Sequence, residues 1–213
     1  MFTASQVREV MGLRRSQMPT RRHKRILGDR GASAVEAAIV TPVVMALLFG
    51  VIELGFVFKD YLAVAGAVRA GVRTASANPR TATFAQVAAD TVAATGGAMN
   101  FSDVTQLWVY KVNTTGNKPV GQTDFSNCTV CVQFRWDTGT QAFVPKTGSL
   151  DPTWAAITQN ACSLSIGGPL DRVGVYIQLK HDPLTGFVFQ TIYISESSIL
   201  SFVPFPVSAG CKP

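Results

Sequence analysis

The sequence is poor in charged residues and in the motifs from which most active sites are built. Only 15% of its 213 residues are charged, against about 25% in typical domains, which excludes a disordered acidic or basic tail. It has two histidines, and no P-loop, G-x-S-x-G, H-E-x-x-H or paired acids. We therefore expect no enzymatic activity, no catalytic residue, no cofactor and no metal. Its 18 glycines and 11 prolines are too few for a collagen-like or low-complexity chain.

The basic residues are concentrated at the N-terminus. Residues 1–31 contain eight lysines and arginines and two acids, whereas residues 32–213 contain eleven residues of each sign. The whole net charge of +6 therefore lies in the first 31 residues. This distribution argues against a uniformly basic nucleic-acid-binding domain, and we expect no nucleic acid among the partners.

The apolar residues are concentrated as well. Residues 37–58 form a run of 22 residues with a single charge, Glu53. A membrane helix needs about 20 such residues, and the run lacks the polar positions at a period of 3.6 that a buried helix would show. It predicts a transmembrane segment. The alternatives are a very apolar core helix and a secretory signal peptide cleaved near residues 63–67.

The charges on either side of this run predict its orientation. Basic residues before the run outnumber those just after it, so the positive-inside rule places the N-terminus in the cytoplasm. We expect a single-pass protein of the cell membrane, with a basic cytoplasmic leader (1–31) and a long helix (32–78) that contains the transmembrane segment 37–58. The remainder, 79–213, would form an extracytoplasmic domain.

The junction between the leader and the apolar run is the most informative stretch. It reads RGASAVEAAIVTP over residues 30–42, and LLFGVIELG follows over residues 47–55. An R-x-G-x-R element, Arg69 to Arg73, comes later. Over residues 30–77 this pattern resembles the TadE-like family of tight-adherence (Flp) type IV pilus assembly proteins. Members of this family resemble minor pilins. Residues 181–186, HDPLTG, resemble a turn segment of its actinobacterial members.

The resemblance implies a prepilin processing site at Gly31, Ala32 and Glu36. A membrane peptidase would cut after Gly31, and Glu36 would become the fifth mature residue and pair with the N-terminal amine of a neighbouring subunit. The alternative is that Glu36 is only an N-terminal cap residue of a helix. Ser33 and Glu36 also fit a capping box, which is compatible with either role.

Glu53 is the second acid of the apolar region. A carboxylate inside a membrane is costly unless it is paired or reaches the interface. Glu53 can therefore be an interfacial acid, pair with Lys59, or meet a basic group on the helix of another subunit. The resemblance implies the subunit contact, because the family carries a glutamate at this position.

The periodicity of the remaining sequence predicts an α+β fold. We expect a long helix over 33–77, whose small residues let it pack closely on a partner or on the soluble domain, and a second helix over 83–95. Runs rich in β-formers then predict strands at 104–112, 130–136, 173–180 and 187–202, with a short helix near 154–159 and a hairpin connection at 181–186. These elements suit an antiparallel sheet packed with helices, in a pilin-like plan.

All four cysteines follow the transmembrane segment, on the side where disulfides persist. The C-x-x-C pair opens a strand rather than a helix, which favours structural disulfides over redox or zinc chemistry. Three residues of strand span about 10 Å, too far for a bond between Cys128 and Cys131. We predict Cys131–Cys162 and Cys128–Cys211. A strand that starts only at Cys131 would instead permit the local bridge and leave Cys162–Cys211.

The sequence as a whole favours a minor pilin-like membrane subunit that supports assembly of a tight-adherence pilus. The implied partners are the pilus assembly machinery, other pilin-like subunits, the prepilin peptidase and the membrane. The runner-up is an unprocessed single-pass protein with an extracellular binding domain. A membrane-tethered redox or hydrolytic enzyme is the third hypothesis.

Overall fold

The computed structural model describes residues 28–146, 154–162, 169–186 and 190–204. The chain falls into two units that divide between Val44 and Met45, and each is described by itself. The helices are α1 (Gly28–Ala77) and α2 (Phe84–Thr95), with 3-10 turns η1 (Phe101–Asp103) and η2 (Ala156–Thr158). The strands are β1 (Val104–Lys111), β2 (Cys131–Asp137), β3 (Ala142–Pro145), β4 (Arg172–His181) and β5 (Ile192–Ser201).

The part of α1 in the first unit is apolar and uncovered. Residues 31–44 are all exposed, including Ile39 at 68% and Val43 at 59%. Within the described residues, α1 is the one helix long and apolar enough to cross a membrane. Because these side chains are not buried inside the fold, the alternative of an apolar core helix is disfavoured for this segment.

The start of α1 differs from the expected one. The helix begins at Gly28 rather than near residue 33, so Ser33 lies inside it and the capping box predicted for Ser33 and Glu36 is wrong. Glycine lowers helix stability without forbidding the helix, and no proline stands between residues 28 and 41. Pro42 consequently lies in the interior of the helix.

In the second unit, α1 becomes amphipathic. Its buried side chains recur at intervals of three and four residues, at Val64, Ala67, Val68, Val72 and Ala75, which is the spacing of one helix face. The buried residues of α2 are also small or apolar, with Phe84 at the N-terminal end. The two helices thus present apolar stripes that can cover the same sheet.

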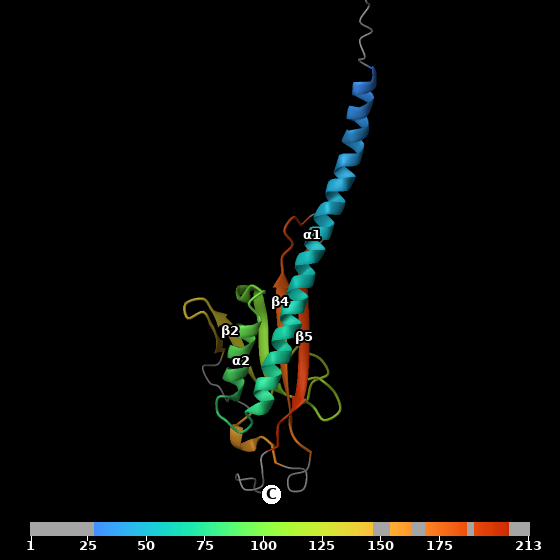
Figure 1. Cartoon of the computed structure of the whole chain (residues 1–213). Helices are drawn as coiled ribbons and strands as arrows, with labels where there is room; N and C mark the ends of the chain where they lie inside the picture. The colour runs from blue at the N-terminus through green and yellow to red at the C-terminus, as the bar shows by residue number, and fades with distance from the viewer. Residues whose placement is uncertain (1–27, 147–153, 163–168, 187–189, 205–213) are drawn as a thin grey trace, which may run out of the picture. The chain divides into compact units, whose positions relative to one another are not determined.

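The strands form a five-stranded sheet in the order β3-β2-β1-β4-β5, and every neighbouring pair is antiparallel. The α+β, pilin-like plan is therefore confirmed (Figure 1). The predicted strands match β1, β2 and β4 to within a residue or two, whereas β5 begins at Ile192 and residues 187–189 lie outside the described residues. Strand β3 was not predicted, because four residues that end in proline give too short a pattern.

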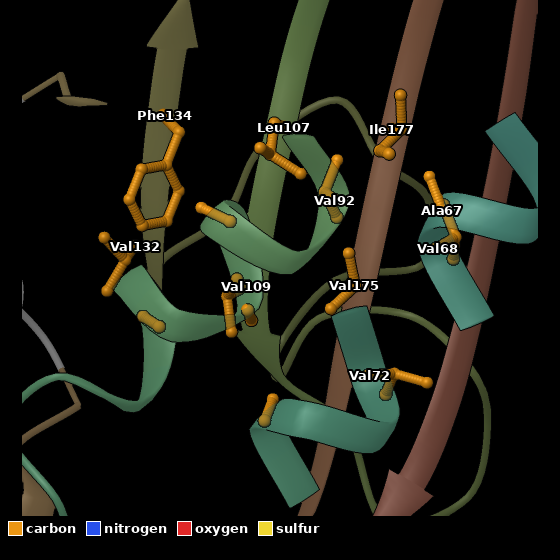
Figure 2. Close-up of a cluster of buried hydrophobic side chains, with 14 of the residues drawn as sticks. Ala67, Val68, Val72, Val92, Leu107, Val109, Val132, Phe134, Val175 and Ile177 are labelled. Carbon is orange, nitrogen blue, oxygen red and sulfur yellow. The ribbon is translucent and has the colours of Figure 1, made fainter. Parts of the chain in front are cut away.

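One face of the sheet carries the main core. Side chains from β1, β2 and β4 meet those of α1 and α2, as Figure 2 shows for Val68 and Val72 of α1 and for Val92 of α2. Alternate residues of a strand point to opposite faces, so Leu107 and Val109 enter this core.

The opposite face of the sheet is also covered. Trp108, Tyr110 and Tyr176 form a second buried cluster, and Phe125, from the connection between β1 and β2, stacks on Tyr176 with ring centroids 4.0 Å apart. Burial on both faces explains why the end of β1 reads as continuously apolar rather than alternating.

Candidate functional site

The acid in the apolar run, Glu53, is enclosed by its own chain. Its residue is 1% exposed, although its neighbours Ile52 and Leu54 are 39% and 54% exposed. The backbone N–H of Thr185 donates to Glu53 Oε1 at 2.8 Å, and the Thr185 hydroxyl donates to the same oxygen at 2.5 Å. The sequence allowed Glu53 an interfacial position, Lys59 or another subunit, and it did not predict Thr185 as the partner.

A second polar contact joins the same two segments. Asp60 Oδ2 of α1 lies 2.7 Å from Nδ1 of His181 at the end of β4, and the His181 residue is 8% exposed. Lys59 pairs with the other oxygen of Asp60 at 3.1 Å, and not with Glu53. The His181 imidazole and the Asp60 carboxylate therefore form a polar contact, and this contact joins the end of β4 to α1.

The connection between β4 and β5 bears both contacts, and we call residues 182–186 with the two flanking strand ends the β4–β5 hairpin. At its base, Asp182 accepts hydrogen bonds from Lys180 Nζ at 2.6 Å and from the Thr191 hydroxyl at 2.7 Å. These bonds, that of Lys180 first, lower the pKa of the Asp182 carboxyl. Gly186 has φ of +61°, a conformation that glycine adopts without strain. Because β4 and β5 are antiparallel neighbours, the prediction of a hairpin connection at 181–186 is confirmed, although β5 begins only at Ile192 and residues 187–189 lie outside the described residues.

A shallow cleft of about 220 Å³ lies beside the hairpin. Its walls combine Lys59 and Asp60 of α1 with Lys180, Asp182 and Leu184. Opposite charges are interleaved here and already paired. Among the residues that the structure describes, no group of three His, Cys, Asp or Glu side chains could hold a metal ion. The paired charges and the His181–Asp60 contact join α1 to the end of β4.

The predicted processing residues lie in the first unit. Gly31, Ala32 and Glu36 are all within α1 and exposed. A side chain at Gly31 would meet no atom within 4 Å, so packing inside the chain does not explain this glycine. Their predicted role depends on a peptidase and a neighbouring subunit.

The glycine and the two arginines of the R-x-G-x-R element lie in different environments. A Cβ atom at Gly71 would lie 2.8 Å from Val92 Cγ2 and 3.2 Å from the Ala88 carbonyl oxygen, so this glycine permits the close approach of α1 to α2. Arg69 and Arg73 are exposed. The expectation that small residues of α1 let it pack on the soluble domain is therefore confirmed at Gly71, whereas Gly66 is exposed and meets nothing within 4 Å.

The disulfide pairing differs from the preferred prediction. Cys128 is bonded to Cys131, with Cα atoms 6.0 Å apart, so Cys131–Cys162 and Cys128–Cys211 are wrong as predicted pairs. The reason is the start of β2 at Cys131: Cys128 lies in the preceding turn, and a turn brings the two Cα atoms within bonding range. Cys162 is also disulfide-bonded, and Cys211 lies outside the described residues.

Sequence reasoning missed two residues of this site, Asp60 and Thr185. Asp60 and Glu53 are seven residues apart, two turns of helix, and so fall on the same face of α1. Two acids on one face of a helix, in or next to an apolar run, could have predicted that a polar segment of the chain packs on that face. The identity of that segment depends on the tertiary fold.

Comparison with known proteins bears on the N-terminal part of the chain. Residues 31–73 match the family model described as TadE-like protein. The match includes the predicted processing residues, Glu53, Asp60 and the R-x-G-x-R element. No curated protein and no solved structure matches the chain. The chain is therefore similar to the TadE-like protein family over residues 31–73, about a fifth of its length.

Proposed function

We propose that this protein is a minor pilin-like membrane subunit that supports assembly of a tight-adherence (Flp) type IV pilus. The match of residues 31–73 to the TadE-like family carries the proposal. In this function α1 anchors the protein in the cell membrane with its N-terminus in the cytoplasm, and residues 79–213 form the extracytoplasmic domain. Its partners are the pilus assembly machinery, other pilin-like subunits and the prepilin peptidase.

The exposed apolar surface of α1 supports the membrane anchor. Leu47 and Val51 are 67% and 69% exposed, and side chains of this kind gain by leaving water for lipid. Disulfides in the sheet domain agree with an oxidising, extracytoplasmic location, since such bonds persist there and are rare in the cytosol.

Cleavage between Gly31 and Ala32 is the processing step of this function. It removes the basic leader 1–31 and leaves Glu36 as the fifth residue of the mature protein, one helical turn from the new N-terminal amine. In a pilus-type assembly, Glu36 then pairs with the amine of a neighbouring subunit, and this pair offsets the cost of a carboxylate at the membrane edge.

The experiment is an intact-mass measurement of the protein extracted from membranes of cells that contain the peptidase. We expect a mass that lacks residues 1–31. Gly31→Leu is expected to leave the precursor uncut, and Gly55→Leu is its matched control. Both glycines lie in α1 with no atom within 4 Å of an added Cβ, so only the first substitution is expected to affect cleavage.

The runner-up function, an unprocessed single-pass protein with an extracellular binding domain, gives a different result. It predicts a mature protein that still begins at Met1 in the same cells. Protease added to intact spheroplasts tests the orientation separately: digestion of the sheet domain is expected, and complete protection would contradict the proposed topology.

A further inference from the structure

The β4–β5 hairpin runs along α1 towards the apolar run. His181 contacts Asp60 and Thr185 contacts Glu53, so the hairpin advances seven residues along the helix, about 10.5 Å at 1.5 Å per residue. Figure 1 shows the segment that follows β4 beside α1. The described end of the hairpin, Leu184 and Thr185, which we call its tip, therefore lies at the level of Glu53, about 7.5 Å inside the end of the apolar run at Phe58.

The surface at this level is apolar. Leu184 at the hairpin tip is 71% exposed, and Phe56 of α1, which lines the same cleft, is 43% exposed. The hairpin thus extends the exposed apolar surface of α1 sideways, and that surface is the one assigned to lipid in the proposed function.

The polar groups are arranged as an interface would require. Thr185 directs its N–H and its hydroxyl to Oε1 of Glu53, which pairs both donors and this carboxylate oxygen where water is scarce. Lysine and tyrosine lie on the domain side of the tip: Lys59 and Lys180 have partly exposed side chains, and Tyr193, paired with Lys180 in the sheet, is 60% exposed. Such residues are typical of the headgroup region of a membrane.

We propose that the tip of the β4–β5 hairpin is a second membrane contact, in which Leu184 enters the outer leaflet of the lipid bilayer beside Glu53. The inference rests on the proposed membrane anchor. The occupant is the bilayer because the exposed apolar surface is continuous with that of α1. Contact at two places holds the sheet domain at a fixed distance from the membrane, while the Thr185–Glu53 bonds shield the one carboxylate within the outer half of the apolar run.

The experiment measures immersion depth by spin labelling of the full chain in lipid nanodiscs. Single cysteines replace Leu184, Val51 or Ile157, and each is labelled without reductant, because none of the described cysteines is free. Val51 is the reference for the membrane segment, and Ile157 in η2, which is 79% exposed, is the matched control for an exposed apolar residue away from the hairpin. The readout compares collisions of the label with oxygen, which concentrates in lipid, and with a water-soluble nickel chelate.

The proposal predicts that oxygen collisions exceed nickel collisions at residues 51 and 184, and that nickel collisions exceed oxygen collisions at residue 157. An oxygen-favoured label at 51 together with a nickel-favoured label at 184 would overturn the hairpin contact and leave the membrane anchor intact; the exposed tip would then face water or another protein. Nickel-favoured labels at both positions would overturn the membrane anchor as well. Thr185→Val removes the hydroxyl donor to Glu53 and is expected to shift the label at 184 towards the nickel-accessible value.

Discussion

The close approach of α1 to α2 at Gly71 gives a prediction that can be worked out in detail. In Gly71→Ala, the new methyl group would lie 2.8 Å from Val92 Cγ2 and 3.2 Å from the Ala88 carbonyl oxygen. Val92 and Ala88 are both 0% exposed, so neither side chain nor backbone has free space to withdraw into. Overpacking of this kind costs about 1–3 kcal/mol of folding free energy.

The cost is opposed by helix propensity, since replacing glycine by alanine inside a helix gains about 1 kcal/mol. The Gly66→Ala variant separates the gain in helix propensity from the packing cost. Gly66 lies in the same helix, is exposed and has no atom within 4 Å of an added Cβ, so this variant receives the gain without the clash. The difference between the two variants is therefore the packing cost alone, about 1–3 kcal/mol.

The assay is thermal unfolding of the full chain in detergent micelles, followed by circular dichroism. In a chain of this length, 1 kcal/mol shifts Tm by roughly 2–4 °C. We expect Gly66→Ala to melt above the wild type and Gly71→Ala to melt several degrees below Gly66→Ala. Val92→Ala is expected to cost less in the Gly71→Ala background than alone, because it removes the clashing methyl group. An equal or higher Tm for Gly71→Ala than for Gly66→Ala would refute the reasoning.

Three further predictions concern the disulfide, the α1–β4 contact and acid stability. Tryptic mapping without reductant should give one peptide ending at Arg135 that carries the Cys128–Cys131 bond internally, whereas a cross-link between this peptide and the peptide that contains Cys162 would contradict that pairing. Asp60→Ala should lower the stability by about 1–3 kcal/mol, because it leaves His181 without the carboxylate that faces it at 2.7 Å; Asp90→Ala, on the exposed side of α2, should change it by less than about 0.5 kcal/mol. The pKa of the Asp182 carboxyl is lowered in the fold. The ionised carboxylate therefore contributes to folding stability above its unfolded-state pKa, near 3.9. This contribution is lost as the pH falls through the lower pKa of the folded state. Asp182→Asn should therefore flatten the acid limb of the stability profile, and an unchanged limb would show that Asp182 is not a source of it.

The helices and most of the strands could be predicted from the sequence because their signals are local. An apolar run of 22 residues indicates a membrane-length helix by its length alone, and alternation at 131–137 marks β2 without reference to any other strand. The TadE-like pattern is likewise contiguous, and the family match covers residues 31–73. Strand β3 escaped detection because a strand of four residues is defined mainly by its pairing with β2.

The cysteine pairing depends on the residue at which β2 begins, and a shift of a few residues changes the predicted pairs. The predicted strand began at Val130, and a strand through Cys128 forbids the local bridge, whereas a strand that begins at Cys131 allows it. Strand ends are set by the hydrogen bonds to the neighbouring strand, here between β1 and β2 with Tyr110 opposite Cys131. The residues around Cys131 do not by themselves determine this register.

The sequence by itself determined the long apolar helix, the family signature and the presence of two acids on α1. The tertiary structure alone decided what those acids contact, because His181 and Thr185 lie 121 and 132 residues away along the chain. A buried carboxylate must find a donor, so a partner for Glu53 could be expected from the sequence. Which donor it finds depends on the antiparallel pairing of β4 with β5, since that pairing fixes where the hairpin turns and brings Thr185 to the helix.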